Sequence, residues 1–325
     1  MMSDRDRDLQ SAIDDIRKSY GKGVVWRMNE LPLESVPCFS TGILSLDEAI
    51  GAGGIPRGRI TEIFGDESTG KTTLALQVVA EVQRQGGICV YVDAENALDL
   101  SLASRIGVDV DSMIISQPDT GEQGLDIVER FVQSGAVDLV VVDSVAALVP
   151  RSELEGDIGD SHVGLQARLM SQALRKMSGM VSKSGTAVIF INQIRMKIGV
   201  LFGSPETTSG GKALPFYSSL RIRLSGGEQI KKGDQLVGRF VRAKCVKNKI
   251  APPFRQASFR IYFGTGISRA SGLIDLALQR GVIVKSGSWL TYGERRWQGE
   301  ANFIEAVDAD SALYDEIRGA VAEKA

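Results

Sequence analysis

The sequence predicts an α/β fold whose mostly parallel sheet is covered by helices on both faces. Short apolar runs alternate with segments of helical periodicity, and a glycine-rich loop follows the first of these runs. Strands this apolar, separated by helices, are typical of parallel sheets that are buried on both sides. The predicted strands are 60–64, 88–92, 113–116, 139–142 and 187–191, and the predicted helices are 72–85, 98–106, 123–134 and 165–182.

The glycine-rich loop, residues 65–72, reads GDESTGKT and matches the phosphate-binding pattern G-x-x-x-x-G-K-[ST]. Its glycines let the backbone N–H groups turn inward, and the helix that follows adds partial positive charge at its N-terminus. Lys71 can reach the β- and γ-phosphates, and the Thr72 hydroxyl can bind Mg²⁺. The alternative is a glycine-rich turn before an amphipathic helix. Because the flanking strand and helix are those that the motif needs, the pattern favours ATP binding.

Polar side chains follow three of the predicted strands at the points where the strands end. Glu95 lies just after residues 88–92, Asp143 directly after 139–142, and Gln193 just after 187–191. Ligands of such sheets bind beyond the carboxyl ends of the strands. Asp143 is suited to bind Mg²⁺, and Glu95 is suited to act as the general base that activates water. Gln193 could contact the γ-phosphate through its amide and change position on hydrolysis. The alternative for Asp93 and Asp143 is capping of the next loop or helix.

The composition of the chain limits the kinds of binding site, cross-link and cellular location that are expected. The chain has 325 residues, 43% of them hydrophobic, and a formal net charge of −2, so any polyanion site has to be a local patch. Its cysteines, Cys38, Cys89 and Cys245, are scattered, as expected of a cytoplasmic protein without disulfides. The single histidine, His162, argues against a histidine-based triad or zinc site. No apolar run is long enough for a membrane span, and the charged N-terminus is unlike a secretory signal.

Three domains are expected. Residues 1–35 combine an amphipathic helix with a short strand at 24–26, and a lone helix of this kind has to pack on another surface. Residues 36–268 form the α/β core. Residues 269–325 form a small α/β lobe with helices at 273–278, 301–307 and 311–322 and strands at 282–285 and 288–292.

Two loops of the core and one basic stretch suggest a polyanion partner. Residues 151–164 are polar and acidic, while 194–211 are rich in Gly, Ser and Thr and too long for a simple connector, which suits either a sugar-phosphate site or a mobile lid. Residues 239–260 carry basic residues and no acidic one, which favours a polyanion over a solvated strand face. These basic residues are Arg239, Arg242, Lys244, Lys247, Lys249, Arg255 and Arg260.

Long strings of the sequence closely resemble the RecA family of bacterial recombinases, in order from about residue 9 to residue 300. They are GDESTGKTTLALQ, YVDAENALD, QPDTGEQ, LVVVDSVAALVP, EGDIGDSHVGLQARLMSQALRK, IFINQIRMKIGVLFG and VKNKIAPPF. The resemblance implies a RecA-like P-loop ATPase core that forms a helical filament on single-stranded DNA and pairs it with a homologous duplex. It also implies that the filament promotes self-cleavage of a LexA-type repressor.

The resemblance also implies roles for individual residues. Glu95 would be the catalytic carboxylate, supported by Lys71 and Gln193, and Thr72 and Asp143 would hold Mg²⁺. Lys247 and Lys249 would be donated to ATP across a subunit interface, Phe216 would be an interface aromatic, and the N-terminal helix would pack on the adjacent subunit. The nucleotide-binding residues would be Gly65, Asp66, Glu67, Ser68, Thr69, Gly70, Lys71, Thr72, Thr73 and Asp99. The DNA-binding residues would be Arg168, Ser171, Arg175, Arg195, Met196, Ile198, Thr208, Gly210 and Gly211, with Arg242 and Lys244 in secondary DNA binding.

The chain departs from the family pattern in four places. Asn96 stands where histidine is common, and Leu102 lies near the usual position of an aromatic that stacks on adenine. An arginine pair common near Ser225-Gly226 is missing, and the sequence ends without an acidic tail, so we expect weaker duplex capture but also weaker autoinhibition of duplex binding. Two other functions stay open: a RecA-like hexameric helicase or branch-migration motor, and an ATP-switched DNA-binding scaffold without a need for hydrolysis.

Overall fold

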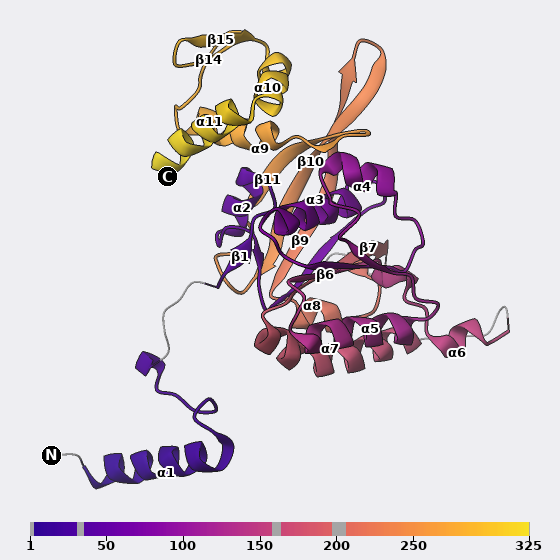
Figure 1. Ribbon diagram of the computed structural model, residues 1–325, viewed down its shortest axis with the longest axis vertical. Coiled ribbons are helices and arrows are strands. Elements are labelled where there is room, and N and C mark those ends of the chain that lie inside the picture. The colour runs from indigo at the N-terminus through magenta and orange to yellow at the C-terminus, as the bar shows by residue number, and fades with distance from the viewer. Residues whose placement is uncertain (1–2, 31–35, 158–163, 197–205, 325) are drawn as a thin grey trace. The chain divides into compact units, whose positions relative to one another are not determined.

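A computed structural model describes residues 3–30, 36–157, 164–196 and 206–324, and it confirms the predicted α/β class (Figure 1). The chain divides into two compact units, Met1–Ser35 and Val36–Ala325. The domain boundary predicted near residue 268 lies within the second unit and stays a prediction.

The first unit contains helix α1 (Asp4–Tyr20) and the 3-10 turn η1 (Met28–Glu30). Ser3 and Asp6 form a reciprocal capping box at the start of α1. Arg17 donates from its guanidinium to the carbonyl oxygen of Val25 and to Glu30, which joins the helix to the segment after it. The strand predicted at 24–26 does not form within a single copy, because among the described residues this segment pairs with no other strand.

The central sheet of the second unit has the strand order β12-β11-β10-β9-β3-β7-β6-β4-β5. The strands β3 (Ile60–Gly65), β4 (Cys89–Asp93), β5 (Ile114–Ser116), β6 (Leu139–Asp143) and β7 (Ala187–Met196) are parallel, as predicted, and β9 (Leu220–Lys232) continues the parallel set beside β3. The strands β10 (Gln235–Asn248), β11 (Gln256–Tyr262) and β12 (Gly266–Ile267) then extend the sheet in antiparallel fashion.

Helices cover both faces of this sheet (Figure 1). On one face, α2 (Leu44–Ile50), α3 (Lys71–Arg84) and α4 (Leu100–Ile106) bury residues such as Ile50, Leu76 and Ala103 in one apolar cluster. On the other, α5 (Gly121–Ser134), α7 (Leu165–Ser184) and α8 (Ala213–Tyr217) contribute Val128 and Leu174 to a second cluster. Short elements complete the core: β1 (Cys38–Phe39), β2 (Ile55–Pro56), η2 (Val145–Ala147), α6 (Arg151–Leu154) and β8 (Glu206–Thr208).

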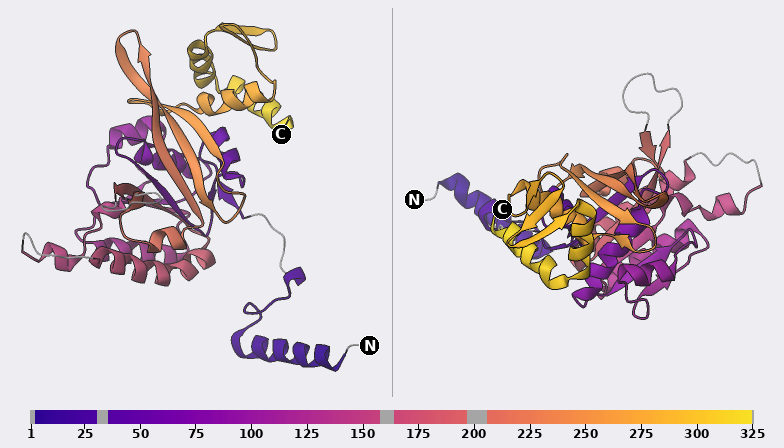
Figure 2. Two further views of the ribbon diagram at one scale, coloured as in Figure 1. Left: turned by 180° about the vertical axis from the view of Figure 1, so that it is seen from behind. Right: turned by 90° about the horizontal axis from the view of Figure 1, so that it is seen from above.

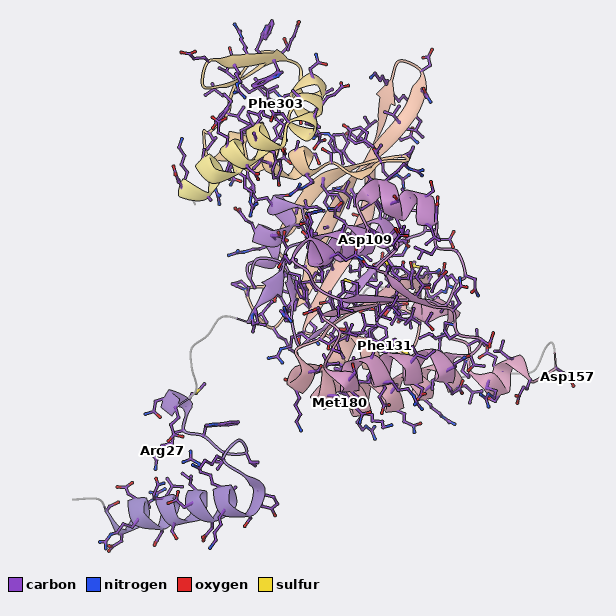
Figure 3. All side chains as sticks on the ribbon, in the orientation of Figure 1. Arg27, Asp109, Phe131, Asp157, Met180 and Phe303 are labelled. Carbon is purple, nitrogen blue, oxygen red and sulfur yellow. The ribbon has the colours of Figure 1, made fainter. Side chains whose placement is uncertain are left out.

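The C-terminal segment has its own apolar cluster. Helices α9 (Arg269–Gln279), α10 (Glu300–Ala309) and α11 (Ser311–Glu323) pack with the antiparallel sheet of β13 (Val284–Ser286), β14 (Trp289–Tyr292) and β15 (Arg295–Gln298). Phe303, labelled in Figure 3, lies in this cluster with its ring edge-on to Trp297. The predicted helices and strands are confirmed here, and β15 is an element that the sequence did not indicate.

The long hairpin of β9 and β10 is the largest feature that sequence reasoning missed (Figure 2). Its burial alternates along β10: Val241, Ala243 and Cys245 are buried, whereas Arg242 and Lys244 between them are exposed. This alternation places the two basic residues on one face of the strand.

A buried ion pair joins β9 to the centre of the sheet. Glu62 on β3 has no exposed side-chain surface, and it accepts hydrogen bonds from Arg221 on β9 and from Asn192 on β7. The Arg221 guanidinium also lies 4.6 Å from the centre of the Phe64 ring. Removing the cation of such a buried pair leaves its carboxylate without a charged partner, which is costly.

Replacing Arg221 by alanine should therefore lower the melting temperature. Leaving a buried charge without its partner costs about 3 kcal/mol or more, which corresponds to roughly 6–12 °C in a domain of this size. Arg130→Ala is a matched control, because Arg130 pairs with Asp126 on the surface of α5 and should change the melting temperature little. A change for Arg221→Ala no larger than that of the control would contradict this view of the pair.

Candidate nucleotide and DNA site

The glycine-rich loop lies between β3 and α3, as predicted. Ser68 and Gly70 both adopt the left-handed backbone conformation, with φ of 56° and 87°. The positive φ of Gly70 favours glycine, and a β-carbon there would lie 2.1 Å from Cδ1 of Ile261 on β11, so a larger residue would also displace that side chain. The N-terminus of α3, which begins at Lys71, faces the loop with its free N–H groups.

Lys71 is directed back into the loop. Its ammonium donates to the carbonyl oxygens of Gly65, at 3.2 Å, and Asp66, at 2.6 Å. Partial burial lowers the pKa of Lys71, and the nearby carboxylates of Asp143 and Glu95 partly oppose that shift. The cation therefore lies where phosphates bound by the loop would meet it.

Thr72 and Asp143 form a corner suited to a divalent cation. The Thr72 hydroxyl donates to Oδ2 of Asp143 at 2.7 Å, and the Tyr91 hydroxyl donates to the same oxygen at 2.7 Å. Burial raises the pKa of Asp143, while these two hydrogen bonds act in the opposite direction. Within the described residues no group of three or more acidic, histidine or cysteine side chains could hold a metal. One hydroxyl and one carboxylate suit Mg²⁺, which takes its other ligands from phosphates and water.

Glu95 and Gln193 meet beside this corner. The Gln193 amide donates to Oε1 of Glu95 at 3.3 Å, and the Ser144 hydroxyl donates to the same oxygen. Glu95 is exposed, so a water molecule can reach it. Asp93, by contrast, is buried and accepts from the backbone N–H groups of Ala97 and Leu98, so for this residue the capping alternative holds.

A cavity of about 270 Å³ opens beside the loop. The loop side is formed by Ser68, Gly70, Lys71, Thr72 and Thr73, and the opposite side by Arg239, Ile261 and Phe263. The sequence analysis did not name Ile261 or Phe263 as site residues. The signal available for Phe263 was an aromatic residue just before a glycine turn, and the structure leaves it 53% exposed.

Asp99 lies outside the lining of this cavity. Its carboxylate caps α4 by accepting from the backbone N–H groups of Ser101 and Leu102, at 2.8 and 3.0 Å. Its role in nucleotide binding stays a prediction.

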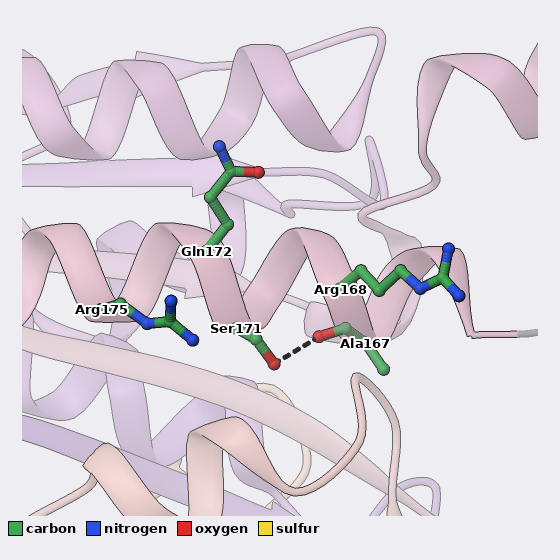
Figure 4. Close-up of a pocket in the computed structure, with 5 residues that line it drawn as sticks. All are labelled: Ala167, Arg168, Ser171, Gln172 and Arg175. Carbon is green, nitrogen blue, oxygen red and sulfur yellow. Dashed lines mark hydrogen bonds between the residues drawn. The ribbon is translucent and has the colours of Figure 1, made fainter.

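One face of α7 lines an open groove of about 600 Å³ (Figure 4). Arg168 and Arg175 are exposed there, and the Ser171 hydroxyl between them donates to the carbonyl oxygen of Ala167 at 2.7 Å. Figure 4 shows the two guanidinium groups extending from the same helix. Two cations at this spacing suit the phosphates of an extended strand.

The ends of the second predicted loop are ordered as a hairpin. β7 continues to Met196 and pairs with β8, and this hairpin projects from the core (Figure 2). Arg195 and Met196, the last described residues of β7, are exposed, whereas Thr208 on β8 is buried. Ile198 lies outside the described residues, as do parts of both predicted DNA-binding loops.

Gly210 and Gly211 pack closely on α7 and η2. A β-carbon at Gly210 would lie 2.9 Å from Val145, and one at Gly211 would lie 2.7 Å from Ala167. The N–H of Gly210 donates to Gln166 at 3.1 Å. The base of the loop is thus held against the helix that carries Arg168 and Arg175.

The comparisons with known proteins agree along the whole chain. The family model for the RecA N-terminal domain matches residues 7–268, and that for the RecA C-terminal domain matches residues 271–325. The chain belongs to the RecA family. It is 54% identical to Protein RecA of Thermus aquaticus, over 100% of this chain and 96% of that protein. It is 56% identical to Protein RecA of a strain of Thermus thermophilus, over 98% of this chain and 94% of that protein.

RecA membership makes the chain a recombinase of DNA repair that binds ATP and DNA. The described part of the chain contains no helix both long and apolar enough to cross a membrane.

The residues that the RecA resemblance assigns to a subunit interface lie away from the glycine-rich loop. Lys247 pairs across the sheet with Arg221, and Arg221 with Glu62, three residues before the end of β3 at Gly65. The Lys247 ammonium donates to the carbonyl oxygens of Pro215 and Phe216 in α8, at 2.6 and 2.9 Å. Burial lowers the pKa of Lys247, and the neighbouring Lys249 adds to that shift.

Lys249 and Phe216 are both exposed, Phe216 to 70%. Neither side chain lines the cavity beside the loop within this chain. Their roles at an interface stay predictions.

Proposed function

We propose that this RecA protein hydrolyses ATP when bound to single-stranded DNA, assembles on it as a helical filament, and pairs that strand with a homologous duplex. The observation that carries the proposal is the convergence of Lys71, Thr72, Glu95, Asp143 and Gln193 at one edge of the sheet. These residues supply a cation for the phosphates, two ligands for Mg²⁺, a general base and an amide that can contact the γ-phosphate. Together these are the groups that phosphoryl transfer to water needs.

Each residue then has a defined task. Thr72 and Asp143 would hold Mg²⁺, which would neutralise charge on the β- and γ-phosphates. Lys71 turns from its own carbonyl partners to the same oxygens. Glu95 accepts a proton from the attacking water, which its exposure allows. The Gln193 amide leaves Oε1 of Glu95 and donates to the γ-phosphate instead. The position of the Gln193 side chain therefore depends on whether that phosphate is present.

A second copy completes the site in this proposal. Lys247 and Lys249 lie near the start of β3, whereas the loop lies beyond its end, so they are poorly placed to reach the same chain's phosphates. Supplied by a neighbouring subunit, the two lysines would add positive charge to the γ-phosphate side, and Phe216 beside them would pack in the same interface.

DNA is bound through phosphate contacts rather than through base reading. Arg168, Ser171 and Arg175 on α7, Arg195 and Met196 on the projecting hairpin, and the Gly210-Gly211 turn form the proposed primary surface. Arg242 and Lys244, exposed together on β10, form the proposed secondary surface for duplex DNA.

In the proposed filament, the open edge of the sheet in one copy contacts the first unit of the next copy. Among the described residues β5 pairs with β4 alone, and Ile114 and Ile127 line an apolar groove of about 440 Å³ beside it. The helix of the first unit buries none of its residues, and Val24 and Trp26 are 55% and 49% exposed. An open strand edge is a template for another chain, so residues 24–26 of a second copy are the proposed occupant.

Family membership alone supports a further role, in which the filament promotes self-cleavage of LexA-type repressors. The hexameric helicase or branch-migration motor stays the second candidate, because it would share the same ATP site. The two assemblies differ in shape, since a recombinase forms helical filaments and such motors form closed rings.

Glu95→Gln should lower ATP hydrolysis at least about 100-fold in the presence of single-stranded DNA, because it removes the general base and keeps the side chain's shape. Affinity for ADP should change less than about two-fold. Phosphate release with and without DNA measures the rate, and Glu305→Gln on the surface of α10 is the matched control. Wild-type hydrolysis without DNA stimulation would contradict the main proposal, and full activity of Glu95→Gln would favour a switched scaffold.

Ile114→Asp should abolish filaments on single-stranded DNA with an ATP analogue, as seen by electron microscopy, because a carboxylate cannot be buried in an apolar contact without a large cost. Val284→Asp, on the exposed strand β13, should assemble as the wild type does. Filaments of normal length from Ile114→Asp would contradict the proposed contact, and closed rings from the wild type would favour the helicase.

A further inference from the structure

We propose that Arg239 is an additional nucleotide-binding residue, which contacts the part of the nucleotide that ATP and ADP share. The inference rests on the proposed function, since it assumes that the glycine-rich loop binds ATP. Arg239 lies on β10, far from the loop in sequence, and the sequence analysis placed it only in a basic stretch.

Arg239 is tied directly to the phosphate-binding loop. Its Nη1 donates to the carbonyl oxygen of Ser68 at 2.7 Å. Ser68 is one of few non-glycine residues with positive φ among those described, and a carbonyl fixed by a cation helps to hold that conformation. The guanidinium therefore takes part in the shape of the loop before any phosphate arrives.

The guanidinium also has an N–H donor without a partner, and the side chain lines the cavity. Arg239 lines the 270 Å³ cavity together with Lys71, Thr72 and Phe263. Its Nε is shielded from solvent and has no hydrogen-bond partner within the described residues. A buried N–H group without a partner is costly, and a planar cation facing a phosphate loop is suited to donate to a phosphate oxygen or to a nucleobase.

The position of the cavity indicates which part of the nucleotide Arg239 meets. The cavity begins at Lys71 and Thr72, proposed for the β- and γ-phosphates and their Mg²⁺, but its lining does not include Glu95, Asp143 or Gln193. The lining instead combines the first turn of α3 with apolar side chains of Ile261 and Phe263. Such a wall suits the α-phosphate and the base, where a guanidinium can both bind an oxygen and stack on a ring.

The test measures affinity for fluorescent analogues of ADP and ATP with Mg²⁺ and without DNA, for the wild type, Arg239→Ala and Lys231→Ala. Arg239→Ala should weaken both nucleotides by a similar factor of about ten, the size expected for charge-assisted hydrogen bonds. Its nucleotide-free melting temperature should fall by only about 2–4 °C, because the one bond lost without nucleotide is the hydrogen bond to Ser68. Lys231→Ala, an exposed cation on the same hairpin, should match the wild type.

Unchanged affinity for both nucleotides in Arg239→Ala would overturn the inference, as would weaker binding of ATP alone. A much larger fall in the nucleotide-free melting temperature, of about 10 °C or more, would also overturn it, because that result marks a mainly structural role. If the wild type bound neither nucleotide, the proposed function would fail first, so the two failures can be told apart.

Discussion

The in-register pairing of the parallel strands is the constraint on which the site depends. Gly65 at the end of β3 is level with Gln193 on β7, and Asp93 at the end of β4 is level with Asp143 on β6. Because all these strands run in one direction, the loops that follow them emerge at one edge. The phosphate loop, the metal corner and the Glu95–Gln193 pair are therefore brought together by backbone hydrogen bonds, before any side chain contributes.

The same strands connect the nucleotide edge to the DNA surface. β7 runs without a break from Gln193, beside Glu95, to the exposed Arg195 and Met196. At its centre, Asn192 donates to Glu62 and to the carbonyl oxygen of Ser209, at 2.9 and 3.0 Å, which fixes the far end of the projecting loop to the core. In the proposed mechanism, a change in the position of Gln193 reaches the proposed DNA-binding loop through the strand itself and through the two hydrogen bonds of Asn192.

Much of this arrangement was predictable from the sequence, because it depends on local patterns. The G-x-x-x-x-G-K-[ST] loop and the acids and amides after apolar strands are short-range signals, and the parallel order of the strands then places them together. The contribution of Arg239 was not predictable in this way. It depends on the β9–β10 hairpin, whose register and bulges bring residue 239 beside Ser68, and no local pattern specifies such a pairing. The strand expected at 24–26 is absent from the described residues of a single copy for a related reason, since a strand forms only with a pairing partner.

The central claim is that ATP at the glycine-rich loop controls DNA binding through Gln193. Its most direct test is the affinity for single-stranded DNA in the presence of ADP and of a non-hydrolysable ATP analogue, for the wild type and Gln193→Asn. The wild type should bind DNA at least about ten-fold more tightly with the ATP analogue, within the range of coupling free energies between sites. Gln193→Asn keeps the amide but withdraws it from Glu95, so it should lose most of this difference while binding both nucleotides as before. An undiminished difference in Gln193→Asn would contradict the account.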